Sequence, residues 1–144
     1  MAGIQNRRHN RLSVRPRLRI DYLTYLKSAV RVALVNNGTG PAIIRSVSIT
    51  VDGRTVNADD VPVAVAAAKR LDIPGPFDSY LPSPGDTLRA TESVDLLIVL
   101  DFPEDIAQRK DLRRKLHRID FHVTYESIYG ETFSLPAPRG LTTA

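Results

Sequence analysis

The sequence predicts a mainly β protein, an antiparallel β-sandwich of about seven strands with two short helices in the connections. Two observations lead to this prediction. Apolar residues recur at every second position in several short stretches, which is the period of half-buried strands. Turn-forming residues such as Asp52-Gly53 and Gly130 separate some of these stretches by only a few residues. Such short turns require the strands that they join to run antiparallel.

Length and composition fit one globular domain. The chain has 144 residues, of which 42% are hydrophobic and 25% charged, and a chain of this size can bury an ordinary core. We predict a basic N-terminal arm over residues 1–12, a single domain over residues 13–136 and a flexible tail over residues 137–144. The chain has no cysteine, which excludes disulfides and thiolate metal sites.

The first half of the chain contains most of the predicted strands. From Ser13 to Tyr22 apolar residues alternate with an arginine row, and Pro16 places this strand at a sheet edge because it has no N–H to donate. Further strands are predicted over residues 29–35, 43–51 and 54–56. The first two of these are separated by a turn rich in small residues. We interpret this turn as structural rather than as a ligand-binding loop; its residues are Asn36, Asn37, Gly38, Gly40 and Pro41.

The second half combines strands with two helices. The first helix is predicted to begin at Asp59-Asp60, with Pro62 in its first turn, and to end near Leu71. A proline-rich loop follows over residues 72–86, and the second helix is predicted over residues 103–116. Strands are predicted over residues 93–100, 119–126 and 131–135, with a short strand over 87–89. The strand–helix–strand segments also fit an α/β fold, but the hairpins favour an immunoglobulin-like arrangement.

Three short stretches carry a resemblance to a known group of proteins. They are residues 9–16 (HNRLSVRP), 36–42 (NNGTGPA) and 125–131 (YESIYGE). With these stretches the chain resembles a group of small uncharacterised bacterial proteins, in which an immunoglobulin-like domain usually follows one N-terminal transmembrane helix. This sequence departs from the group because only eight residues precede His9 and none of them form a membrane span. The resemblance implies the fold and implies no catalytic residue.

Positive charge is concentrated in two segments. Residues 1–20 carry a net charge of +6 and residues 109–118 carry +5, so the rest of the chain is acidic, since the whole chain carries +4. We hypothesise that these segments form a surface for nucleic acid or anionic lipid. Basic stretches without aromatic residues do not favour base stacking. The candidate residues are Arg7, Arg8, Arg11, Arg15, Arg17, Arg19, Arg109, Lys110, Arg113, Arg114 and Lys115.

The sequence predicts no catalytic and no metal site. It contains no nucleophile elbow and no phosphate-binding loop. Asp120, His122 and Glu126 share one face of a predicted strand. They form an incomplete metal-ligand set, and we interpret this face as a solvated one.

We therefore predict a non-enzymatic protein-interaction or structural module that recruits an unknown protein partner through its loops or an edge strand. The alternative is a domain that binds nucleic acid or anionic lipid through its basic arm and second helix. An enzyme of another type is the third hypothesis. No small-molecule cofactor is expected. We expect a soluble chain in the cytoplasm or on the cytoplasmic side of a membrane.

Overall fold

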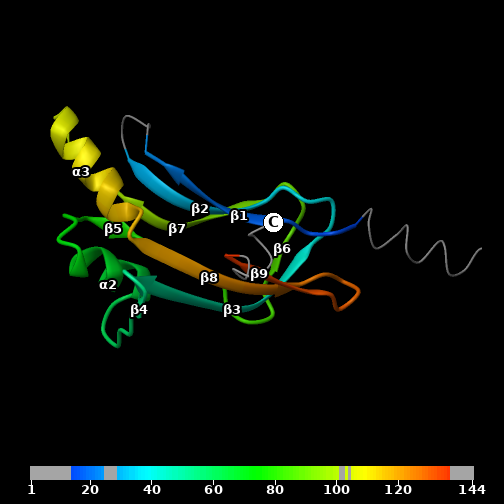
Figure 1. The fold of residues 1–144 in the computed structure, drawn as a ribbon. Helices are drawn as coiled ribbons and strands as arrows, with labels where there is room; N and C mark the ends of the chain where they lie inside the picture. The colour runs from blue at the N-terminus through cyan, green and yellow to red at the C-terminus, as the bar shows by residue number, and fades with distance from the viewer. Residues whose placement is uncertain (1–13, 25–28, 101–102, 104, 137–144) are drawn as a thin grey trace, which may run out of the picture.

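The protein is built from two antiparallel β-sheets packed face to face, with two helices at one end (Figure 1). The computed structural model describes residues 14–24, 29–100, 103 and 105–136. The predicted arm over residues 1–12 and the predicted tail over residues 137–144 lie outside these residues. The mainly β class predicted from the sequence is confirmed.

The first sheet has the strand order β1-β2-β7-β5, and every neighbouring pair is antiparallel. Its strands are β1 (Leu18–Leu23), β2 (Val30–Asn36), β7 (Ser93–Val99) and β5 (Phe77–Asp78). β1 lies at the edge of this sheet, as Pro16 predicts, and begins two residues after that proline. The sheet places β2 and β7 at its centre, which explains why both strands are mostly apolar.

The second sheet has the order β4-β3-β8-β9. Its strands are β3 (Ala42–Val51), β4 (Arg54–Thr55), β8 (Ile119–Glu126) and β9 (Thr132–Leu135). A further strand, β6 (Thr87–Leu88), pairs with the beginning of β3, whereas β4 pairs with its end. The antiparallel pairing of β3 with β8 is the longest in this sheet. Its register places the end of β3 opposite the start of β8, at the end of the molecule where the helices lie.

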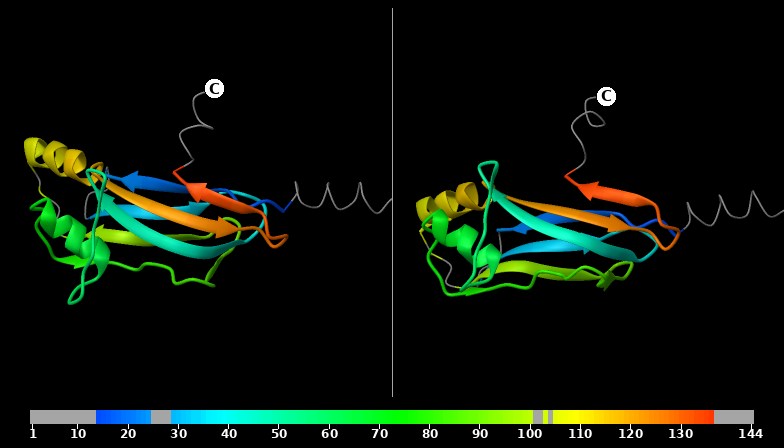
Figure 2. Two further views of the ribbon diagram at one scale, coloured as in Figure 1. Left: turned by 60° about the horizontal axis from the view of Figure 1, so that its bottom comes forward. Right: turned by 90° about the horizontal axis from the view of Figure 1, so that it is seen from below.

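Figure 2 shows the two sheets as separate layers, and the hydrophobic core lies between them. Leu34 of β2 and Leu97 of β7 come from one sheet, and Ile49 of β3 comes from the other; each is at most 1% exposed. Removal of these side chains from water is the main stabilising contribution to such a fold. Hydrogen bonds also join the sheets, and two of those in the described residues involve tyrosine hydroxyls. Leu18 N–H donates to Tyr125 Oη at 3.2 Å, and Tyr22 Oη donates to the Ile119 carbonyl at 2.9 Å.

The two helices lie together at the end of the molecule where β8 begins (Figures 1 and 2). They are α2 (Val63–Arg70) and α3 (Ile106–Leu116). α3 is capped by Asp105, whose carboxylate accepts hydrogen bonds from the backbone N–H groups of Ala107 and Gln108. Neither helix has the length and apolar character that are needed to span a bilayer.

The sequence prediction is wrong about the start of α2. The helix begins at Val63, and its N-cap is Pro62 without a side-chain cap, rather than the acidic pair Asp59-Asp60. The physical reason is the proline itself, because its ring disfavours the helical conformation at the residue before it, Val61. A helix that contained both the acidic pair and Pro62 would place Val61 in that disfavoured conformation.

The described residues form nine strands rather than about seven. Eight of them correspond to the eight stretches predicted above, and the ninth is β5, which lies within the proline-rich segment that we predicted as a loop. β4, β5 and β6 have only two residues each. Strands this short have no detectable periodicity in the sequence, since they form where a longer neighbour offers unpaired backbone groups.

Candidate anion-binding site

The two basic segments lie far apart in the part of the chain that the structure describes. Residues 14–17 and the β8–β9 turn occupy one end of the sheets, whereas α3 occupies the opposite end, which we call the helical end (Figure 1). Arg7, Arg8 and Arg11 lie outside the described residues. The described parts of the two segments therefore form no shared surface.

The arginine row that leads into β1 is largely neutralised. Arg15 forms an ion pair with Glu131 at 3.2 Å, and Arg19 forms one with Asp21 at 3.0 Å. The Arg15 guanidinium also lies 5.7 Å from the centre of the Phe133 ring. Exposed ion pairs contribute little stability, but they lower the positive potential that this surface presents to an anion. Arg17 is the one residue of the row for which the described residues supply no ion pair.

α3 presents a basic face that is not neutralised in this way. Leu112 and Leu116 are buried and hold the helix against the core. Lys110, Arg113 and Arg114 are exposed, and no described carboxylate lies in ion-pair contact with any of the three. We call these three residues the α3 basic face.

Three basic residues of α3, Arg109, Arg113 and Lys115, have hydrogen bonds or ion pairs within the described protein. Arg109 Nε donates to the Pro103 carbonyl at 2.8 Å. Lys115 pairs with Asp111 at 3.3 Å and also reaches the Asp72 carbonyl at 3.4 Å. The Arg113 Nε group donates to Thr24 Oγ1 at 3.0 Å, which leaves its charge unbalanced because a hydroxyl is neutral. Of the five basic residues predicted on α3, Lys110, Arg113 and Arg114 are the three that are exposed and have no ion pair among the described residues.

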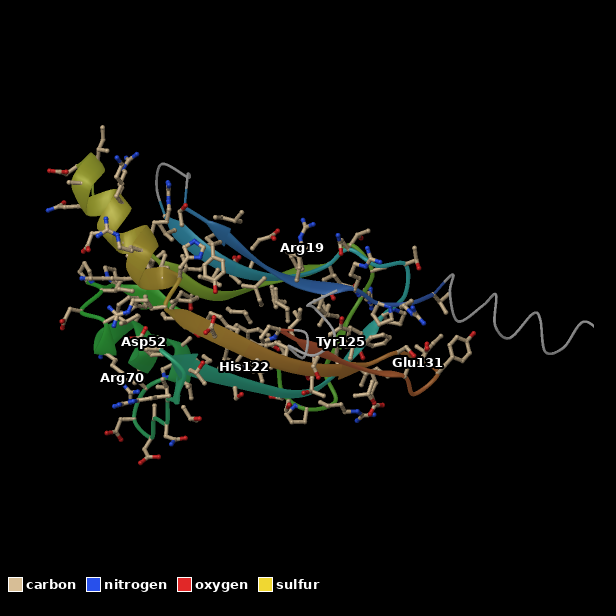
Figure 3. The ribbon with its side chains drawn as sticks, in the orientation of Figure 1. Arg19, Asp52, Arg70, His122, Tyr125 and Glu131 are labelled. Carbon is tan, nitrogen blue, oxygen red and sulfur yellow. The ribbon has the colours of Figure 1, made fainter. Side chains whose placement is uncertain are left out.

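Sequence reasoning missed a second group of arginines at the helical end. A pocket of about 650 Å³ lies between the β3–β4 hairpin, the end of α2 and the start of β8. Arg54, Arg70 and Arg118 line it together with one carboxylate, that of Asp52. Figure 3 labels Asp52 and Arg70, which lie at the helical end. We call it the arginine pocket. The three arginines are scattered along the sequence, and only the pairing of β3 with β8 places Arg118 beside the hairpin.

Asp52 and Arg118 form the fixed side of this pocket. Arg118 Nε donates to the two carboxylate oxygens of Asp52 at 3.0 and 3.1 Å, and its Nη2 group contacts Oδ2 as well. The Asp52 backbone N–H donates to the Arg118 carbonyl at 3.1 Å. The hydrogen bonds from Arg118 hold the pKa of the Asp52 carboxyl below its ordinary value, helped by the charges of Arg118 and Arg54 and opposed by desolvation. Asp52 is therefore ionised at neutral pH.

The predicted structural turn is organised by Asn36, which is fully buried. Its Oδ1 accepts from the backbone N–H groups of Arg17 and Gly38, and its Nδ2 donates to the carbonyls of Gly40 and Leu88. Side chains are excluded at the two glycines, because a Cβ on Gly38 or Gly40 would lie 2.4 or 1.7 Å from a backbone oxygen of residues 14–15. Asn37 and Pro41 complete the connection between β2 and β3.

The described parts of the three stretches that carry the sequence resemblance meet at one end of the molecule. The Arg15 carbonyl accepts a hydrogen bond from Thr39 N–H, while the Arg15 side chain reaches Glu131 in the β8–β9 turn. Ser127 is buried in that turn, where its Oγ accepts from the N–H groups of Tyr129 and Glu131. The described parts of the three stretches thus lie together, although the stretches are up to about a hundred residues apart in the sequence.

The acidic and histidine residues of β8 do not form a metal centre in the described chain. His122 Nε2 lies 3.0 Å from Thr50 Oγ1, and Glu126 pairs with Arg45 at 3.0 Å. Asp120 is exposed on the same strand. The residues that the structure describes contain no group of three His, Cys, Asp or Glu side chains that could hold a metal ion.

Comparison of the chain with protein-family models, with curated proteins and with solved structures finds no match in any of the three. The function is therefore inferred from the positions, contacts and charges of the described residues.

Proposed function

We propose that the protein is a non-enzymatic interaction module with an immunoglobulin-like fold, and that its helical end binds an anionic partner. Immunoglobulin domains of the constant type place strands A, B, E and D in one sheet and C, F and G in the other. The orders β1-β2-β7-β5 and β3-β8-β9 match that pattern when the strands are lettered along the chain, with β4 and β6 as additions. The strand order thus supports the fold assignment.

The observation that carries the functional proposal is the α3 basic face. Lys110, Arg113 and Arg114 lie on one exposed helix surface without an ion-paired carboxylate among the described residues. α3 is held by Leu112 and Leu116, so its outer surface contributes nothing to the core. Clusters of cationic side chains provide most of the affinity of proteins for polyanions, through the release of condensed counterions. The β1 arginine row lacks this property because two of its members already have carboxylate partners.

The proposal is tested by binding the protein to a duplex DNA of about 20 base pairs and to phosphatidylserine vesicles over a series of salt concentrations. The wild type is compared with the triple variant Lys110→Ala, Arg113→Ala and Arg114→Ala. We expect salt-dependent binding by the wild type to at least one probe. For DNA, log K falls with log salt, and we expect the magnitude of this slope to be smaller by about 2 to 3 in the variant, because three phosphate contacts are removed.

A matched control is available in the β1 row. The triple variant Arg15→Ala, Arg17→Ala and Arg19→Ala removes the same net charge, and we expect it to retain most of the binding. Absence of binding by the wild type to both probes at about 50 mM salt would show the proposal to be wrong, because counterion release is strongest there. Equal losses in both triple variants would also contradict it, since net charge and not the α3 basic face would then be responsible.

A second candidate function is recruitment of a protein partner at the opposite end. Ile128 and Tyr129 at the tip of the β8–β9 turn are 51% and 41% exposed, and exposed aromatic residues commonly anchor protein interfaces. The two candidates place the partner at opposite ends of the molecule, so they are separated by locating the bound surface.

A further inference from the structure

The arginine pocket has a geometry that is set by three structural elements. Asp52 and Gly53 form the hairpin turn with positive φ angles of 50° and 82°, as a two-residue β-hairpin requires. Arg54 follows at once and pairs with Val51, so its position depends on the hairpin. Arg70 ends α2, and Arg118 is held by Asp52 at the start of β8. The pocket walls are therefore regular structure rather than a long loop.

The charge of the pocket is unbalanced. The lining residues carry three guanidinium groups and one carboxylate, which leaves a formal charge of +2. Asp52 already forms an ion pair with Arg118, and the described residues supply no ion pair to Arg54 or to Arg70. Two arginines are therefore available to a ligand, and Arg118 adds its charge from a fixed position.

The size and lining of the pocket suit a small anionic group. Its lining includes Val51 and Leu71, which are only 4% and 5% exposed. Thr55 adds a hydroxyl group to the lining. A volume of about 650 Å³ lies within the usual range of ligand pockets, roughly 300–1,000 Å³. An anion bound there would have guanidinium groups, a hydroxyl group and apolar side chains among its neighbours.

We propose that the arginine pocket binds a phosphomonoester dianion, an inference that rests on the proposed binding of anions at the helical end. A phosphomonoester carries about −1.5 to −2 charge at pH 7 and has three terminal oxygens that accept hydrogen bonds. This charge matches the +2 of the pocket. The planar guanidinium group donates two parallel hydrogen bonds to phosphate oxygens. A phosphodiester carries a single charge and one terminal oxygen fewer, so it matches the pocket less well.

The direct test is calorimetric titration of the full chain with phenyl phosphate at constant ionic strength. We expect saturable binding that Arg54→Ala and Arg70→Ala each weaken about tenfold or more, the effect of losing a hydrogen bond to a charged group. Arg70→Lys should recover only part of the affinity, because an ammonium group cannot replace the guanidinium fork. Arg118→Ala is unsuitable as a test variant because it would leave Asp52 without its partner.

Lys69→Ala is the matched control. Lys69 is the exposed neighbour of Arg70 in the last turn of α2, and it does not line the pocket. We expect this variant to bind phenyl phosphate nearly as well as the wild type does. Equal weakening by Lys69→Ala and Arg70→Ala would overturn the inference, because a general positive field and not the pocket would explain the binding. Equal affinity for phenyl phosphate and for methyl phenyl phosphate, a diester, would also overturn it.

The phosphate group can belong to a free metabolite or to a phosphorylated side chain, and a second titration distinguishes these sources. A short phosphoserine peptide is compared with phenyl phosphate and with the unphosphorylated peptide. Tighter binding of the phosphopeptide supports a phosphorylated protein as the source, and tighter binding of phenyl phosphate supports a small molecule. Binding of the unphosphorylated peptide with the affinity of the phosphopeptide would contradict the inference.

Failure of this inference is distinguishable from failure of the proposed function. The α3 triple variant retains every residue of the arginine pocket, so we expect it to bind phenyl phosphate like the wild type. Salt-dependent DNA or vesicle binding without phenyl phosphate binding would overturn the pocket assignment alone. Phenyl phosphate binding without either polyanion interaction would overturn only the role of the α3 basic face.

Discussion

Asn36 illustrates how one residue determines the structure of a whole connection. Its side chain is fully buried and forms four hydrogen bonds, two as acceptor and two as donor. These bonds join β2 to the segment before β1, to the turn that follows and to the end of β6. A buried amide is stabilising only when its hydrogen-bonding groups are satisfied, and those of Asn36 all are.

We therefore predict that Asn36→Ala destabilises the protein by about 3 kcal/mol, because the substitution leaves buried backbone groups without partners. Urea unfolding followed by circular dichroism measures this change. Thr39→Ala is the control, since Thr39 lies exposed in the same turn and should change stability by no more than about 0.5 kcal/mol. Similar losses in the two variants would contradict the role given to the Asn36 side chain.

At the scale of elements, Tyr22 links an edge strand of one sheet to the other sheet. Its hydroxyl donates to the Ile119 carbonyl at the start of β8, and its ring lies 4.4 Å from the His117 ring between their centroids. Burial, together with the negative charge of Asp120, raises the pKa of Tyr22 to about 12. An unfolded tyrosine titrates near pH 10, about two units lower.

The raised pKa predicts a specific loss of stability in alkali. Above about pH 10 the unfolded chain releases the Tyr22 proton whereas the folded protein retains it, so the contribution of this group is complete below pH 10 and disappears towards pH 12. Urea midpoints of the wild type and of Tyr22→Phe are compared at about pH 8, 10 and 12. We expect the wild type to have the higher urea midpoint at about pH 8, and the difference in midpoint between the two proteins to decrease towards about pH 12.

Tyr80→Phe is the control for this experiment. A hydrogen bond to Asp86 also raises the pKa of Tyr80, but the residue is 55% exposed. The difference in urea midpoint between the wild type and Tyr80→Phe should therefore change less with pH. Parallel loss of stability in the wild type and in Tyr22→Phe would show that the buried phenol does not retain its proton.

The elements differ in how far the sequence predicts them, and the difference has a physical cause. β3, β7 and β8 agree with the predicted ranges within one residue at either end, because their alternation of apolar and polar residues is a local property. β5 and the beginning of α2 were not predicted. The first depends on a neighbouring strand, and the second depends on a steric effect of Pro62.

The candidate sites also differ in how far the sequence predicts them. The basic residues of α3 lie close together in the sequence, so the sequence alone shows their concentrated positive charge. It does not show which of them form ion pairs. Arg54 and Arg70 went unnoticed because isolated arginines are common on protein surfaces. Their convergence with Arg118 requires the β3–β8 register, which places residue 51 opposite residue 119. A register of this kind joins segments about seventy residues apart and has no local signature.

At the scale of the whole molecule, the two ends of the sheets have different surface chemistry. One end carries neutralised arginines and the exposed side chains of Ile128 and Tyr129, and the other carries the α3 basic face and the arginine pocket. The core between them is continuous and draws on both sheets. The ends are therefore separate surfaces on one scaffold, and binding at one end leaves the other accessible.

This separation predicts where a bound polyanion slows amide hydrogen exchange. With the duplex DNA or the vesicles that retain the protein, we expect added protection in α3 and none in residues 127–131. The α3 triple variant should lose that protection while it keeps the slow exchange of β2 and β7, whose amides are buried at the centre of their sheet. Protection at residues 127–131 in place of α3 would reverse the assignment, because the partner would then lie on the end that bears Ile128 and Tyr129.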